Sequence, residues 1–160
     1  MNGGTNAQDK TGQICLANIV VGQTISAGWT ATILNFSSFT GDNKYFQNVS
    51  NNTVKILKKG NYLVNFTLGI SGGMGKQFLS MISVNTITRC ITRHVLTEND
   101  EEWNVSIILP LDVNDSVQFV MNSPQTTGST QAWSQFQIAH LGGGRKLISR
   151  ILSFFGRCRR

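Results

Sequence analysis

The sequence predicts an all-β protein: an antiparallel two-sheet sandwich of the jelly-roll type, followed by a short C-terminal amphipathic helix. Two observations carry the β prediction. Between residues 13 and 140, short segments rich in Val, Ile, Phe, Thr and Tyr alternate with turn residues about every eight to twelve positions, a spacing typical of sandwiches and barrels. No window before residue 145 shows the apolar stripe of a helix.

Nine segments have the composition of strands. In chain order they are residues 13–21, 29–36, 53–57, 60–70, 78–84, 86–96, 103–109, 113–121 and 131–140. The clearest alternation lies in residues 60–70, where Tyr62 and Phe66 fall on one face and Leu63 falls on the other. A period of two is typical of an antiparallel strand that covers a core with one side. Turn residues separate the segments at 41–43, 50–52, 58–60, 71–75, 97–102 and 113–115.

The charge divides the chain into a body and a tail. The net charge is +6, but residues 1–144 carry eight cations and all eight acids. The other six cations lie in residues 145–160, which hold no acid. We therefore expect a flexible arm at 1–12, a jelly-roll domain at 13–141, a glycine hinge at 142–144 and a basic amphipathic tail at 145–160. The excess charge describes the tail and gives no clue to what the neutral body binds.

The tail has the pattern of an amphipathic helix with basic flanks. Its apolar stripe consists of Leu147, Ile148, Ile151, Leu152 and Phe155, and the cations beside it include Arg145, Lys146, Arg150 and Arg157. This pattern favours an anchor that docks into a groove of a larger protein assembly, such as a capsid or surface layer, or packs against neighbouring subunits. An anionic membrane surface is a weaker alternative, and contact with nucleic acid is weaker still.

The three cysteines, Cys15, Cys90 and Cys158, lack the spacing of a disulfide framework or a zinc finger. A bridge between Cys15 and Cys90 would require their strands to lie side by side, so free thiols are favoured. The first residues lack the basic and apolar regions of a secretory leader, and we expect no secretory signal. No apolar run approaches the roughly 18–20 residues that span a bilayer.

The residues give little support to an enzyme. His94 and His140 are the two histidines, and Cys90 lies four residues before His94, too far along one strand for a dyad. We expect no catalytic residue, no metal site and no cofactor. The acidic run at residues 98–102 could form a calcium loop, but its spacing does not match an EF-hand, and a solvated hairpin loop is favoured.

Two stretches carry a pattern that is recognisable in combination. In residues 33–70, an aromatic-bearing loop leads into a short strand, a K-G-x-Y turn and an alternating strand. In residues 104–141, an L-x-L-x-x-x-D-x-V segment precedes a final strand with S-x-F-x-I. The positions concerned are Gly60, Tyr62, Phe66, Leu109, Leu111, Asp115, Val117, Ser134, Phe136 and Ile138. Over residues 13–141 the chain resembles the tumour-necrosis-factor and complement globular-head superfamily, including its bacterial and phage members.

The resemblance implies a jelly roll that forms a tight homotrimer through apolar residues near the threefold axis. It also implies a ligand, a recognition head or a fibre tip rather than an enzyme. The chain departs from the family in one respect, because a tail of sixteen residues, 145–160, follows the domain. That tail leaves the usual exit geometry at the threefold axis in question.

Apolar side chains on strand faces opposite the presumed core also favour association. Candidates for the trimer interface are Leu63, Ile107, Phe136 and Ile138. A monomer would expose some of them, and contiguous apolar surface usually marks an interface. A homotrimer or another homo-oligomer is therefore favoured over a monomer.

Together these features predict a non-enzymatic trimeric structural or recognition protein. We expect a head fibre, capsid decoration or appendage of a virion, by preference a phage. It would be displayed on the particle surface for host attachment through a receptor or glycan, and a terminal segment would anchor it. Two alternatives stay open: a bacterial surface or spore-coat recognition head of the same superfamily, and a small jelly-roll capsid protein whose basic tail contacts nucleic acid or membrane.

Overall fold

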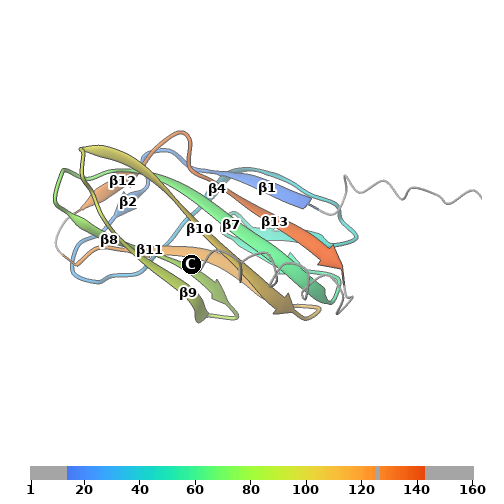
Figure 1. Cartoon of the computed structure of the whole chain (residues 1–160). Helices are drawn as coiled ribbons and strands as arrows, with labels where there is room; N and C mark the ends of the chain where they lie inside the picture. Colours follow the sequence, from blue (N-terminus) through green and yellow to red (C-terminus); the bar gives the residue numbers. More distant parts are fainter. Residues whose placement is uncertain (1–13, 125–126, 143–160) are drawn as a thin grey trace, which may run out of the picture.

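The structure, a computed structural model, describes residues 14–124 and 127–142 (Figure 1). Every regular element in these residues is a β-strand. The described residues contain no helix that is long and apolar enough to cross a membrane. The predicted arm at 1–12, hinge residues 143–144 and the whole basic tail lie outside the described residues. The predicted tail helix therefore stays a prediction, and so does the anchoring role of Arg145, Lys146, Leu147, Ile148, Arg150, Ile151, Leu152, Phe155 and Arg157.

Two antiparallel sheets form a sandwich, which confirms the all-β, two-sheet prediction. Sheet A contains β1 (Ile14–Ile19), β2 (Thr24–Ile25), β4 (Phe36–Thr40), β7 (Gly60–Ser71), β10 (Asp100–Leu111), β12 (Gly128–Thr130) and β13 (Gln135–Gly142). Sheet B contains β3 (Thr32–Ile33), β5 (Phe46–Ser50), β6 (Thr53–Ile56), β8 (Gln77–Val84), β9 (Ile87–Val95) and β11 (Ser116–Asn122). The long strands of sheet A follow the order β4-β1-β13-β7-β10, and those of sheet B follow β5-β6-β11-β8-β9.

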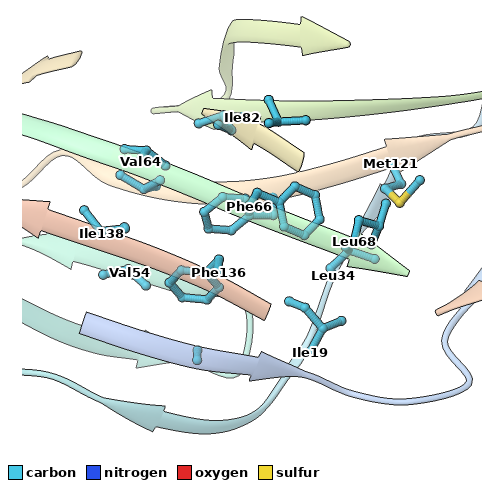
Figure 2. Close-up of a cluster of buried hydrophobic side chains, with 14 of the residues drawn as sticks. Ile19, Leu34, Val54, Val64, Phe66, Leu68, Ile82, Met121, Phe136 and Ile138 are labelled. Atoms are coloured by element: carbon cyan, nitrogen blue, oxygen red, sulfur yellow. The ribbon is translucent and has the colours of Figure 1, made fainter. Parts of the chain in front are cut away.

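Phenylalanine rings in contact join the two sheets at the centre of the core. Phe66 of β7 and Phe136 of β13 extend from sheet A into the core (Figure 2). Their ring centroids lie 4.9 Å and 4.5 Å from that of Phe119 on β11 in sheet B. Phe36 of β4 packs 4.6 Å from Phe136. Burial of each such ring stabilises the fold by about 1.5–3 kcal/mol, and each aromatic pair adds about 0.5–1.5 kcal/mol.

Most predicted strands are present, but within the predicted strand at 29–36 only Thr32–Ile33 and Phe36 belong to strands. Gly28 and Trp29 have positive φ angles of 82° and 66°, which turn the chain before β3 begins. The Trp29 amide donates a hydrogen bond to the carbonyl of Ser123 at 3.0 Å, so a distant loop holds this turn in place. The predicted turn at 97–102 is also too long, because β10 begins at Asp100.

The antiparallel order places the loops at two opposite ends, which we call the base and the tip. Both ends of the described body, the start of β1 and the end of β13, lie at the base together with loops 41–45, 57–59 and 112–115. Loops 20–23, 72–76 and 96–99 lie at the tip. In Figure 1 the base is toward the right and the tip toward the left.

Phe119→Ala should lower the free energy of unfolding by about 3–5 kcal/mol, because it leaves a cavity where rings from both sheets meet. Urea titration followed by circular dichroism measures the loss. Val49→Ala provides the control, since Val49 is 55% exposed and should change stability by about 0.5 kcal/mol or less. An equal loss in both variants would contradict the central position of Phe119.

Candidate self-association face

The outer side of sheet A, which faces away from sheet B, carries three rows of side chains that cross the strands. Because β7 buries Tyr62, Val64 and Phe66, it turns the residues between them outward. Strand register aligns these residues with their neighbours. The apolar row is Ile14, Ala139, Leu63 and Ile108; the central row is Thr40, Leu16, Gln137, Asn65 and Ser106; the tip-side row is Ser38, Asn18, Gln135, Thr67 and Asn104.

The apolar row is accessible to a partner. It crosses four neighbouring strands near the base, and Leu16 of the central row extends it. Ile14 is 40% exposed and Leu16 is 43% exposed, while Leu63 and Ile108 are partly buried by their neighbours. In the isolated chain these side chains form contiguous apolar surface, of the kind that marks an interaction site.

Hydrogen bonds between uncharged side chains order the two polar rows. The Ser106 hydroxyl donates to Oδ1 of Asn65 at 2.8 Å, and Nδ2 of Asn104 donates to Oγ1 of Thr67 at 2.9 Å. On the other side of the face, the Asn18 amide donates to the hydroxyl of Ser38 at 3.0 Å. These pairs hold the flanks of the face in one geometry.

The central strand of the face, β13, has unused hydrogen-bonding groups. Gln135 and Gln137 point outward from β13, between the ordered pairs on β1 with β4 and on β7 with β10. Within residues 14–124 and 127–142, neither side-chain amide has a hydrogen-bond partner. Each amide therefore presents a free donor and a free acceptor at the middle of the face.

The three rows contain no charged side chain, although residues 14–142 carry seven cations and seven acids. The nearest carboxylate toward the tip is that of Glu102, one position beyond the tip-side row on β10. Toward the base, the first charges belong to the exposed ion pair of Lys59 and Asp112. Depletion of charge is characteristic of the buried centre of protein interfaces.

The predicted interface residues have different positions in the fold. Leu63 lies on the outer face of sheet A, as predicted. The predicted outward orientation of Phe136 and Ile138 is wrong, because both are completely buried between the sheets. Ile107 also points toward the core and packs against it. Alternation groups residues on one face of a strand, but the facing sheet decides which of the two faces is buried.

The sequence did not predict that Ile14, Leu16 and Gln137 belong to this face. One signal was available: residues 14–17 are apolar at four successive positions, so this strand carries apolar groups on both sides. The alignment of Leu16 with Gln137 depends on the pairing of β1 with β13, which lie more than a hundred residues apart in the chain. No local pattern records that pairing.

A ring cluster at the base explains the K-G-x-Y turn. The His140 ring lies between Tyr45 and Tyr62, with both centroid distances 4.9 Å, and the Tyr62 hydroxyl donates to the carbonyl of Lys58. Gly60 is required because a Cβ at this position would collide with the imidazole of His140. Burial raises the pKa of Tyr62 to about 12. Burial, and then the positive charge of Lys58, lower the pKa of His140, while the backbone of Lys59 offsets part of this effect.

A second cluster occupies the tip end of β9 and β10. His94 stacks on Trp103 with a centroid distance of 4.4 Å, and its Nε2 lies 2.9 Å from Oε1 of Glu101. The other oxygen of Glu101 accepts a hydrogen bond from the amide of Thr97 at 2.6 Å. This amide, and then His94, lower the pKa of Glu101. Glu101, one carboxylate of the acidic run, is therefore already hydrogen-bonded to the backbone of its own loop.

The described residues contain no group of three or more His, Cys, Asp or Glu side chains that could hold a metal ion. Cys15 and Cys90 are free thiols on β1 and β9, which belong to different sheets and so do not lie side by side. Burial raises the pKa of Cys15 to about 12, which keeps it a protonated, apolar core residue.

No family model and no curated protein matches the sequence. Several solved structures match the fold. Murine APRIL has 11% sequence identity and a TM-score of 0.59, with 80% of this chain and 99% of that chain covered. Eiger TNF from S. frugiperda has 10% identity and a TM-score of 0.59, with 83% and 96% covered. PRD1 vertex protein P5 has 11% identity and a TM-score of 0.62, with 81% and 98% covered. The body therefore has the jelly-roll fold of tumour-necrosis-factor-like proteins.

Stability should fall as the pH decreases below about 6.5, the usual pKa of histidine. The pKa of His140 is lower in the folded protein, so the unfolded chain binds the proton first and is favoured by acid. Urea midpoints at pH 7.5 and pH 5.5 measure this effect, and His140→Phe should reduce the difference. His94→Gln is the control, since it removes the other histidine and should leave the part of the pH dependence that comes from His140. If the difference between the two urea midpoints is unchanged in His140→Phe, the pH dependence does not come from His140.

Proposed function

We propose that the chain is a non-enzymatic structural or recognition subunit that assembles as a homotrimer through the outer face of sheet A. The observation that carries the proposal is the charge-free face, with its half-exposed apolar row beside two ordered polar rows. A monomer would leave this surface in water, where its apolar groups gain nothing. The resemblance of the sequence to the tumour-necrosis-factor superfamily supports three as the number of subunits.

The two ends of the sandwich support a displayed subunit with one attached end and one free end. Both ends of the described body lie at the base, so the tip is available to a partner. The tip carries exposed Trp29, Met74 and Val21, at 57%, 69% and 58%. Backbone hydrogen bonds join its loops, including Gly72 to Asn99. Rigid loops with exposed aromatic and apolar groups suit recognition of a receptor or glycan.

For the location we propose the surface of a virion, as a phage head fibre, capsid decoration or appendage. The fold likeness to PRD1 vertex protein P5 supports this choice. For the attachment we propose the basic tail, whose apolar stripe would dock into a groove of the particle while the glycine hinge leaves the body free to orient. The neutral body and the strongly basic tail fit such a division of roles.

Leu63→Arg should convert the assembly into a folded monomer of 17.6 kDa. An unpaired charge buried in an interface costs about 3–5 kcal/mol, equivalent to a loss of association of about two orders of magnitude or more. Light scattering after size exclusion gives the mass, and circular dichroism checks the fold. Ile91→Arg is the matched control on sheet B, where Ile91 is 58% exposed, and should stay assembled. A wild-type chain that is monomeric would refute the proposal.

Deletion of residues 145–160 should abolish co-sedimentation with the virion particle and leave the number of subunits in the assembled body unchanged. The reason is that the proposed self-association face lies entirely within residues 14–142. Retained co-sedimentation would rule out the tail as the anchor. A fall to the monomer mass would show instead that the tail packs between subunits.

A further inference from the structure

Gln137 occupies the middle of the self-association face. Its strand, β13, is central among the five long strands of sheet A. Within its row, Gln137 lies between Leu16 on β1 and Asn65 on β7. It is half-buried in the monomer, and its carboxamide has no partner within the described residues, whereas Asn65 accepts a hydrogen bond from Ser106.

A surface that covers Gln137 has to satisfy this carboxamide. A buried donor or acceptor left without a partner costs about 1–3 kcal/mol, so an apolar partner is disfavoured at this point. A carboxylate could serve only the donor, and an ammonium group only the acceptor. A second carboxamide serves both, which makes the group its own complement.

Symmetry then restricts where such a contact can form. In a cyclic homo-oligomer, a side chain meets its own counterpart only close to the symmetry axis. A self-complementary group at the centre of the face is suited to that position. The apolar row lies on the base side of Gln137, and the ordered tip-side row lies on the other.

We infer that the Gln137 side chains of the copies of this chain meet at the symmetry axis of the proposed homotrimer, each carboxamide donating to the next, and fix the register of the assembly. The inference rests on the self-association face of the proposed function, and it adds the position of the axis. Polar contacts of this kind specify register and subunit number in other assemblies at some cost in affinity. The apolar row supplies the affinity, and Gln137 selects one arrangement from those that the row would allow.

Gln137→Glu tests this contact, because the two side chains have nearly the same shape. Near pH 7, carboxylates that meet at an axis repel one another, so the assembly should fall to the monomer mass of 17.6 kDa. Near pH 5 the assembly should return, because proximity raises the pKa of these carboxyls above the usual value of about 4.3. The wild type and Gln118→Glu are measured at both pH values. Gln118 is half-buried on β11 in sheet B, and its variant should behave as the wild type does.

A second variant separates this contact from a general effect of charge. Gln137→Lys alone should also be monomeric near pH 7, and its mixture with Gln137→Glu should restore assemblies that contain both chains, as seen by native mass spectrometry. Gln137→Leu should remain associated but with more than one subunit number. An assembled Gln137→Glu without pH dependence, or a mixture that stays monomeric, would overturn the inference.

The controls distinguish this failure from failure of the proposed function. If the wild type assembles and Leu63→Arg disrupts it while Gln137→Glu has no effect, the face is correct and the axis lies elsewhere. If the wild type is monomeric, both proposals are wrong.

Discussion

The contact of phenylalanine rings between the two sheets is the constraint on which the rest of the molecule depends. Phe66 and Phe136 are neighbours in sheet A, and both pack on Phe119 of sheet B. Because side chains alternate along a strand, burying these rings turns Asn65 and Gln137 outward. The core therefore decides which side chains of β7 and β13 form the charge-free face.

The sequence predicted the long strands well because their alternation is a local property. Residues 60–70 have an apolar face, and the strand observed there ends only one residue later. The prediction failed where distant contacts decide the backbone, as at Trp29, whose turn is held by the loop at Ser123. It also failed for the faces of Phe136 and Ile138, because no local pattern states which side of a strand another sheet will cover. Rows across strands depend on register, which turns and bulges determine.

The base and the tip are built in different ways. At the base, aromatic rings hold the last residues of β13 against the turn before β7, and His140 makes this contact sensitive to acid. At the tip, backbone hydrogen bonds join the loops, His94 stacks on Trp103, and Trp29 stays exposed. A subunit attached at the base, as proposed, would need fewer free groups there than at the tip.

The absence of charge from the outer face of sheet A has a consequence for the medium in which the protein works. Dissolved salt weakens attraction between exposed charges beyond a Debye length of about 8–10 Å, but it has little effect on contacts between amides, hydroxyls and aliphatic groups. Some salts, sulfate for example, even favour the burial of apolar groups. Subunits joined through this face would hold together at least as well in brine as in fresh water, so the durability of the assembly would not depend on a low salt concentration.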